Sequence, residues 1–291
     1  MVGERIGFIG LGIMGAPMAR HLLAAGFPLT VHSRSPEPVD ELVAAGAERA
    51  GSPVEVARAS DVVITMLPDT PDVERVMLGE DGIAGGVAAG ALVIDMSTID
   101  PGPARAIAEQ LASKDVEMLD APVSGGERGA IDGTLSIMVG GSDHAFARAT
   151  PILHPMGKNI VHVGPSGAGQ ITKACNQLVV AATIEAVAEA LVLAERSGVD
   201  AAKVREALLG GFAGSKILEV HGQRMLDRTF EPGFRARLHR KDARIVLDAA
   251  KAADSPIPAF LVVAAQLDRL VDDADRGDLD HSALFTLLDE A

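Results

Sequence analysis

Tyrosine and tryptophan are both absent from this chain of 291 residues, and aromatic residues make up only 3% of it. Any enzyme mechanism in which a tyrosine donates a proton is therefore excluded. A proton donor would have to be a lysine, a histidine, a carboxyl group or a bound water molecule.

Cysteine is nearly absent, because Cys175 is the single cysteine of the chain. A disulfide within the chain and a zinc site built from cysteines are therefore excluded. This usage is typical of the reducing cytoplasm, which is the location we expect. Five histidines lack the spacing of metal ligands, and we expect them to be structural or exposed rather than to hold a metal. They are His21, His144, His154, His221 and His281.

Positive charge is scarce: 26 lysines and arginines stand against 40 aspartates and glutamates, which gives a net charge of −14. So acidic a chain is poorly suited to nucleic acid or to an anionic membrane. Long apolar runs are missing too, since none approaches the ~20 residues that a membrane span needs. We expect neither partner, although a local site could still hold a small anion.

Short apolar runs alternate with helical patterns in the first half of the chain. The expected strands are Arg5–Ile9, Leu29–His32, Val62–Met66, Leu92–Asp95, Met118–Asp120, Leu135–Val139 and Ile160–Val163. Gly26 and Gly46 stand where helices should end, and Ser52 to Glu55 has the pattern of a capping box. Such alternation predicts a parallel sheet covered by helices on both faces.

Helical patterns dominate the second half. A stretch rich in Ala, Val, Leu and Glu runs from Ile171 to Arg196. Further helices are expected at Ala201–Leu209, Ser215–Leu226, Lys241–Ala253 and Ala259–Asp275. We place the domain boundary near Ser166, with an α/β domain over residues 1–165 and an all-helical domain over residues 166–291.

A glycine motif follows the first expected strand and opens a helix. Its residues are Gly10, Leu11, Gly12, Ile13, Met14 and Gly15. In this context Gly10 permits a tight turn, Gly12 lets a pyrophosphate approach the backbone, and Gly15 lets the helix pack close to the strand. The free amides at the helix start favour the anion. The pattern predicts a dinucleotide site, and a plain strand–turn–helix junction is the alternative.

The segment after the second expected strand indicates whether the chain prefers NAD(H) or NADP(H). An acidic residue there would bind the adenosine 2′-hydroxyl of NAD, but the segment reads His32-Ser33-Arg34-Ser35. Arg34 can pair with a 2′-phosphate, which favours NADP(H). The alternative is a solvated arginine in a turn before Pro36.

The third expected strand of this half ends at Leu67, Pro68 and Asp69. Ligands bind beyond the carboxyl ends of the strands in such sheets, so Leu67 and Pro68 are candidate cofactor contacts. An ordinary loop before a helix explains Asp69 equally well.

Ser124, Gly125 and Gly126 close the segment that begins at Asp120. A hydroxyl and two glycines with exposed amides would suit a substrate carboxylate. Taken alone, the segment fits a glycine-rich surface turn better.

Lys173, Asn176 and Gln177 share one face of the long helix through their spacing. Lys173 could protonate the oxygen of a reduced carbonyl, and Asn176 could orient the lysine. The alternative is a solvated helix lysine. A second cationic cluster includes Lys241, which either reaches the ligand or lies at a solvated helix start.

With these segments assembled, the chain resembles the β-hydroxyacid dehydrogenase family over nearly its whole length. The matching segments are Gly7–Gly15, Asp120–Gly126, Lys173–Asn176 and His239–Asp242. Within the family, three further segments resemble the branch that reduces tartronate semialdehyde. They are Gly126–Leu135, Gly210–Ser215 and Asp280–Leu284.

The resemblance implies a Rossmann domain joined to an all-α domain built around a long interdomain helix. It implies Lys173 as the catalytic residue with Asn176 as its partner. It also implies a substrate carboxylate on Ser124, Gly125 and Gly126, with Thr98 and Lys241 on the cofactor. Members form homodimers or homotetramers through the helical domain.

Two positions distinguish this chain within the family. Gln177 stands where many relatives have a second asparagine, and the tartronate semialdehyde branch commonly has glutamine there. Phe212 stands where that branch would have a smaller aliphatic residue.

Taken as a whole, the resemblance predicts reduction of tartronate semialdehyde to glycerate, with 3-hydroxyisobutyrate as the rival substrate. An imine reductase has the same architecture but usually lacks the lysine, so Lys173 argues against that function. A non-catalytic nicotinamide-binding module is the rival from another class.

Overall fold

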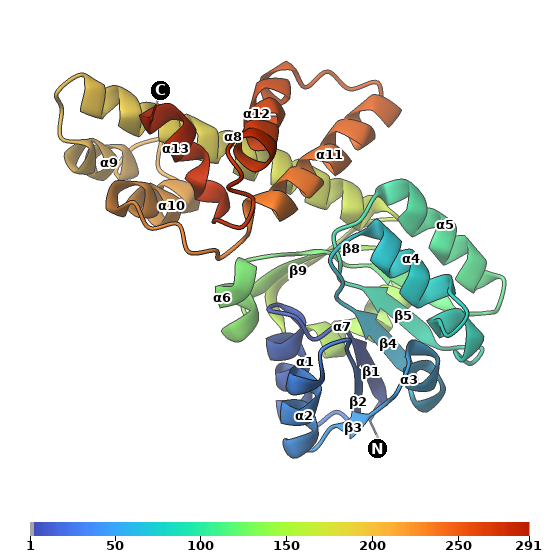
Figure 1. The fold of residues 1–291 in the computed structure, drawn as a ribbon. Coiled ribbons are helices and arrows are strands. Elements are labelled where there is room, and N and C mark those ends of the chain that lie inside the picture. The colour runs from blue at the N-terminus through green and yellow to red at the C-terminus, as the bar shows by residue number, and fades with distance from the viewer. Residues whose placement is uncertain (1–2, 291) are drawn as a thin grey trace. The chain divides into compact units, whose positions relative to one another are not determined.

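The computed structural model describes residues 3–290, and the chain divides between Lys173 and Ala174 into two compact units. We call them the N-terminal unit and the helical unit. The first contains a β-sheet with helices, and the second contains helices and short helical turns (Figure 1).

The strands of the N-terminal unit form one sheet in the described part of the chain. They are β1 (Ile6–Ile9), β2 (Leu29–His32), β3 (Glu48–Arg49), β4 (Val62–Thr65), β5 (Leu92–Asp95), β6 (Glu117–Asp120), β7 (Val123–Ser124), β8 (Leu135–Gly140) and β9 (Gly157–Gly164). Their order is β3-β2-β1-β4-β5-β6-β8-β7, and β9 pairs with β8. Strands β1 to β6 run parallel, whereas β8 runs antiparallel to β6 and β7. The sheet is therefore mostly parallel.

Helices cover both faces of this sheet. They are α1 (Gly15–Ala24), α2 (Pro36–Ala44), α3 (Pro53–Ala59), α4 (Thr70–Leu78), η1 (Ile83–Gly85), α5 (Pro101–Ala112), α6 (Gly126–Ile131) and α7 (Asp143–Leu153). In Figure 1, α1 and α2 lie on one side of β1 and β4, and α3, α4 and α5 lie on the other.

Each central strand contributes to two hydrophobic cores, which explains its unbroken apolar sequence. Val62 and Ile64 of β4 belong to the core beneath α1, α2 and α7, whereas Val63 belongs to the core beneath α3, α4 and α5. Successive side chains of a strand point to opposite faces, so a strand buried on both faces needs apolar residues at every position.

The expected capping box at Ser52 is half formed. Ser52 is the N-cap of α3 and Pro53 begins the helix, but the Ser52 side chain makes no capping hydrogen bond. Instead, Glu55 Oε2 accepts a hydrogen bond of 2.7 Å from the Gly51 amide. The carboxylate thus reaches one residue further back than the motif predicts. Gly26 and Gly46 have positive φ angles of 88° and 112°, as the predicted helix ends require.

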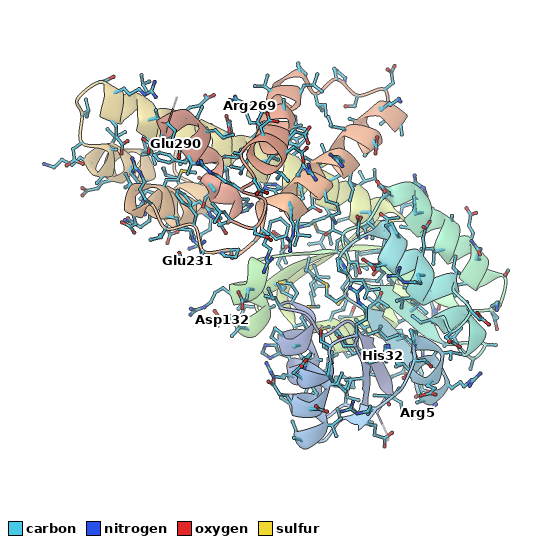
Figure 2. All side chains as sticks on the ribbon, viewed as in Figure 1. Arg5, His32, Asp132, Glu231, Arg269 and Glu290 are labelled. Carbon is cyan, nitrogen blue, oxygen red and sulfur yellow. The ribbon has the colours of Figure 1, made fainter. Side chains whose placement is uncertain are left out.

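The helical unit is built on the second part of α8 (Ala168–Arg196), which begins in the N-terminal unit. Its other helical segments are α9 (Ala201–Leu209), α10 (Lys216–Asp227), α11 (Ala236–Ala252), α12 (Pro258–Asp268), η2 (Arg269–Asp273), η3 (His281–Ala283) and α13 (Leu284–Asp289). Ile184, Leu191, Phe260 and Phe285 belong to its core. Side chains fill the space between these helices, and charged residues such as Glu231 and Glu290 lie at its periphery (Figure 2).

Helix α8 corrects the expectation that no apolar stretch could span a membrane. It has 29 residues, and its most apolar window of 18 residues has a mean hydropathy of 1.8, so it is long and apolar enough by length and composition alone. Half of the most apolar window is buried inside the protein, as in the core helix of a helical domain. Its length and composition are therefore explained by packing.

Helix α11 begins at Ala236, five residues before the expected start at Lys241. The Ala236 amide donates to Leu279 O at 2.8 Å, and the Arg237 amide donates to Gly277 O at 2.9 Å. A distant segment thus satisfies the first helical amides, which local sequence cannot reveal. The cationic cluster consequently lies inside the helix, where His239 and Asp242 are buried.

Candidate functional site

The glycine loop joins β1 to α1, and its three glycines meet different surroundings. Gly10 has a φ of 97°, and a Cβ there would lie 2.3 Å from Met66 O. A Cβ on Gly15 would lie 1.9 Å from Gly10 O, whereas one on Gly12 would meet no heavy atom within 4 Å. Gly10 and Gly15 are thus required by packing, and Gly12 leaves an open approach to the backbone. These surroundings fit a loop that receives a pyrophosphate.

Arg34 follows β2 and is largely solvated. Its side chain is 78% exposed, and its Nη1 lies 3.9 Å from Asp72 Oδ1, which is also paired with Arg75. Ser33 Oγ accepts a hydrogen bond of 3.4 Å from the Leu11 amide. The segment with Arg34 is thereby tied to the glycine loop, and the guanidinium keeps donors for a further anion.

The loops after β4 and β5 are also linked to each other. The Leu67 amide donates to Ser97 Oγ at 2.9 Å, and the Ser97 amide donates to Asp95 Oδ1 at 3.2 Å. Thr98 is half-buried and Pro68 is exposed. Because the strands are parallel, these loops lie at the same edge of the sheet as the glycine loop.

The glycines after Ser124 require backbone conformations that side chains disfavour. Gly125 has a φ of 137° and Gly126 a φ of 62°, and both are exposed. Ser124 ends β7 opposite Ser136, and the short helix α6 starts at Gly126. The segment is therefore an ordered corner of the sheet, held in one shape by strand pairing.

Lys173 lies in the second turn of α8 and is only 7% exposed, so it is not a solvated surface lysine. Two hydrogen bonds to Asp120, at the end of β6, hold the start of this helix. The amides of Gly167 and Gln170 donate to the Asp120 carboxylate at 2.7 and 2.9 Å. Burial raises the pKa of Asp120 to about 6, although these two amides act in the opposite direction.

Three predicted residues of the helical unit are joined through Asp242, which the sequence reasoning missed. Gln177 Nε2 donates to Asp242 Oδ2 at 2.5 Å, and Lys241 Nζ lies 2.9 Å from Asp242 Oδ1. Asn176 Nδ2 donates to Gln177 Oε1 at 2.8 Å. Asp242 is the acid that closes the motif His239–Asp242, and its place beside a cationic cluster was the available signal. Lys173 precedes Asn176 by three residues on the continuous α8, so both share one helical face.

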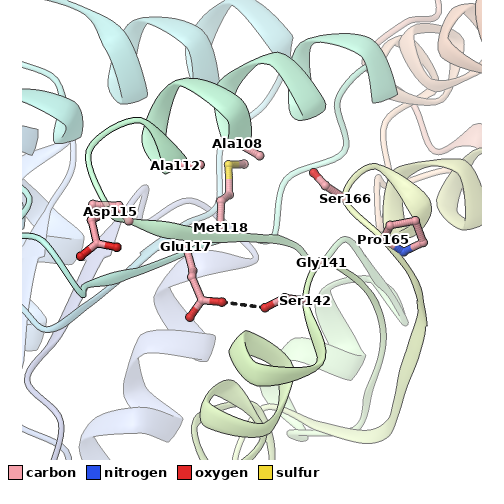
Figure 3. Close-up of a pocket in the computed structure, with 10 residues that line it drawn as sticks. Ala108, Ala112, Asp115, Glu117, Met118, Gly141, Ser142, Pro165 and Ser166 are labelled. Atoms are coloured by element: carbon pink, nitrogen blue, oxygen red, sulfur yellow. Dashed lines mark hydrogen bonds between the residues drawn. The ribbon is translucent and has the colours of Figure 1, made fainter.

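A hollow of about 430 Å³ lies elsewhere on the N-terminal unit and contains none of the predicted site residues. Its lining includes Ala108, Glu117 and Gly141, and Glu117 Oε1 accepts a hydrogen bond of 2.6 Å from Ser142 Oγ (Figure 3). Glu117 starts β6, so this hollow is at the amino end of that strand. Ligands of parallel sheets bind at the opposite ends.

The helical unit contains a cluster of histidines, although their spacing in the sequence is not that of metal ligands. His221, His281 and Asp280 bring their ligating atoms within 4.8 Å of one another, and His281 Nδ1 lies 2.9 Å from His239 Nδ1. Asp280 accepts hydrogen bonds from the amides of Gly233, Phe234 and Ser282, and it pairs with Arg224. A carboxylate so occupied serves the packing of α10, α11 and η3 better than it would serve a metal ion.

Comparison with protein families identifies both halves of the chain. The NAD binding domain of 6-phosphogluconate dehydrogenase matches residues 5–164. The NAD-binding domain of NADP-dependent 3-hydroxyisobutyrate dehydrogenase matches residues 167–288.

Individual relatives agree with these matches. The 2-hydroxy-3-oxopropionate reductase of Escherichia coli is 47% identical over 98% of this chain and 97% of its own length. A Mycobacterium tuberculosis 3-hydroxyisobutyrate dehydrogenase solved with L-serine has a TM-score of 0.89 and 36% identity, covering 98% of this chain and 99% of that chain. Psf3, in complex with NADP+ and 2-OPP, has a TM-score of 0.87 and 26% identity, covering 97% of this chain and 99% of that chain.

Proposed function

This chain belongs to the β-hydroxyacid dehydrogenase family of NAD(P)-dependent oxidoreductases, and on that premise we propose that it reduces tartronate semialdehyde to glycerate, reversibly. The single observation that carries the proposal is the burial of Lys173 on the helix that also bears Asn176. The 47% identity to 2-hydroxy-3-oxopropionate reductase favours this substrate.

A nicotinamide cofactor bound to this chain would supply the hydride for the carbonyl carbon. We assign its binding to the glycine loop, to Arg34, to the loops after β4 and β5, and to the cation of α11. The residues are Gly10, Leu11, Gly12, Ile13, Met14, Gly15, Arg34, Leu67, Pro68, Thr98 and Lys241. The exposed Arg34 favours NADP(H) over NAD(H), since a guanidinium pairs well with a 2′-phosphate.

Lys173 donates the proton to the carbonyl oxygen as the oxygen gains negative charge. Asn176 orients the lysine ammonium and donates a hydrogen bond to the same oxygen. In the oxidative direction the neutral amine takes that proton back from the hydroxyl group. A buried amine suits this role because the low dielectric strengthens its interaction with the developing oxyanion.

The substrate carboxylate binds at Ser124, Gly125 and Gly126, where a hydroxyl and two glycine amides are donors. Gln177 assists from α8, where its side chain is fixed by Asp242. Tartronate semialdehyde carries a hydroxyl group at C2, where 3-hydroxyisobutyrate carries a methyl group, and an amide side chain can recognise that hydroxyl.

Initial rates with each substrate test this choice. We expect kcat/KM for tartronate semialdehyde to exceed that for the semialdehyde of 3-hydroxyisobutyrate by at least tenfold with NADPH. L-serine, the ligand of the mycobacterial relative, should be oxidised more slowly than glycerate. Preference for the 3-hydroxyisobutyrate pair would overturn the substrate assignment. Absence of turnover with every acid, with cofactor still bound, would favour the non-catalytic module instead.

For the whole molecule we propose a cytoplasmic homodimer or homotetramer that acts on a small carboxylate and binds neither nucleic acid nor membrane. The net charge of −14 supports the last two points. Light scattering of the purified protein measures the oligomer, and a monomer at micromolar concentration would contradict this part of the proposal.

A further inference from the structure

Gln170 has a fully buried polar side chain. Its side-chain amide forms hydrogen bonds with the main chain of two residues that flank a third. Its Nε2 donates to Ser97 O at 2.8 Å, and its Oε1 accepts from the Ile99 amide at 3.1 Å. The residue between these two contacts is Thr98. The exposed fraction of Gln170 is 0%, so water cannot replace either bond.

The segment that Gln170 holds is connected to the other ligand-facing loop of the sheet. Ser97 Oγ accepts a hydrogen bond of 2.9 Å from the Leu67 amide after β4. The backbone conformation of the Thr98 segment therefore affects the loop after β4 as well as the loop after β5. A displacement of Ser97 would move the backbone at Leu67 as well.

The backbone of Gln170 is fixed at the same time. Its amide donates to Asp120 Oδ2 at 2.9 Å, and the neighbouring Gly169 is so close that a Cβ there would lie 2.3 Å from Asp120 O. The start of α8 therefore has little freedom to move against β6. Lys173 follows Gln170 by three residues, less than one helical turn.

We infer that Gln170 is a positioning residue, which fixes the Thr98 segment and the Lys173 turn of α8 in one mutual arrangement. The inference rests on the proposed function, in which Thr98 contacts the cofactor and Lys173 moves the proton. A displacement of 1 Å between hydride donor and proton donor is enough to slow such a reaction about a hundredfold.

The contacts demand an amide and not merely a side chain of this size. One partner is a carbonyl that needs a donor, and the other is an amide that needs an acceptor. An ionised glutamate would place oxygen against oxygen at Ser97, and a methionine would leave both main-chain groups buried without a partner. A protonated glutamic acid restores one donor and one acceptor, so it can mimic the amide.

The experiment compares Gln170→Glu and Gln170→Met with Gln110→Glu, a control at an exposed position of α5. Thermal unfolding first establishes the folded fraction of each variant. For the folded Gln170 variants we expect kcat with tartronate semialdehyde to fall at least tenfold, with a rise in the KM for NADPH. Gln110→Glu should leave both parameters unchanged.

Two readouts separate positioning from a simple loss of stability. The activity of Gln170→Glu relative to the parent should recover as pH falls and its buried carboxyl group is protonated, whereas Gln170→Met should show no such recovery. Hydrogen exchange in the ligand-free protein should be faster over residues 97–100 in Gln170→Met, with the rest of the sheet unchanged.

The outcomes are distinguishable from those of the proposed function. If Lys173→Met is inactive but both Gln170 variants match the parent in kcat, KM and exchange, the positioning role is wrong and the catalytic assignment stands. Losses that merely follow the unfolded fraction would also overturn it. If Lys173→Met keeps full activity, the proposed mechanism fails whatever Gln170 does.

Discussion

At the scale of single residues, some polar groups of the site can be identified from local sequence patterns, whereas others are brought together only by folding. Lys173, Asn176 and Gln177 were predicted together because helical spacing is a local property. Asp242 lies 65 positions from Gln177, and no local rule connects them. Gln170 carries no motif of its own, although both ends of its amide are used.

Arg34 provides a test of cofactor choice at this scale. In Arg34→Asp we expect the KM for NADPH to rise about 10- to 100-fold, since a charge-assisted hydrogen bond contributes about 1.5–3 kcal/mol. The KM for NADH should not rise in the same variant, because an acidic residue here can bind the adenosine 2′-hydroxyl, and NADH therefore serves as the internal control. Initial rates with both cofactors measure the effect, and unchanged NADPH kinetics would show that the arginine makes no phosphate contact.

Asp120 predicts a pH dependence of stability. Its folded pKa is about 6 because of burial, above the ordinary value of 3.8. Folding therefore favours the protonated form, and this contribution is fully present below pH ~4 and lost as pH rises through ~6. The difference of about two units corresponds to at most about 3 kcal/mol.

The free energies of unfolding of the parent and of Asp120→Asn, measured by urea titration between pH 4 and 8, test this. The parent should lose stability relative to the variant as pH rises across that window. A difference between the two proteins that stays constant with pH would contradict the raised pKa.

At the scale of elements, prediction was most accurate where the periodicity is strong. The strands at Leu29–His32 and Leu92–Asp95 and the helix at Ala201–Leu209 have the bounds that sequence predicted. The antiparallel direction of β8 was not predicted, because burial patterns do not encode strand direction. The early start of α11 depends on Gly277 and Leu279, which come some forty residues later.

The strand–turn–helix element around the glycine loop allows folding and binding to be separated. Gly15→Ala forces a Cβ against Gly10 O, so we expect the unfolding free energy to fall by about 1–3 kcal/mol or more. Gly12→Ala meets open space, so its stability should stay within about 0.5 kcal/mol of the parent.

Both variants should bind NADPH more weakly. Gly15→Ala displaces the loop backbone, whereas the methyl group of Gly12→Ala blocks the approach of the pyrophosphate. Fluorescence titration gives the affinity and thermal unfolding gives the stability of each variant. If Gly12→Ala bound NADPH as tightly as the parent, the pyrophosphate could not lie against this glycine, and the proposed role of the loop would be wrong.

At the scale of the whole molecule, the division into an α/β half and a helical half was predictable because the hydrophobic period changes along the chain. The family matches meet between residues 164 and 167, near the predicted boundary at Ser166, whereas the two compact units divide after Lys173. The difference arises because α8 starts on the sheet, through Asp120, before it enters the helical unit.

A strongly acidic protein that binds anions must place its cations locally. The net charge is −14, and the proposed anion contacts use Arg34, Lys173 and Lys241 together with backbone amides. The acidic composition argues against nucleic acid and anionic membranes as partners. It could not predict that Lys173 would be buried, because burial depends on contacts between distant segments.

The most direct test of the account is the turnover of Lys173→Met beside its affinity for NADPH, with Lys251→Met as a control at an exposed lysine of α11. We predict a fall in kcat for tartronate semialdehyde of at least a hundredfold, the contribution expected of a proton donor. The NADPH dissociation constant should stay within about threefold of the parent, a change of less than 1 kcal/mol. Turnover equal to that of the parent and of Lys251→Met would contradict the assignment of Lys173 as the proton donor.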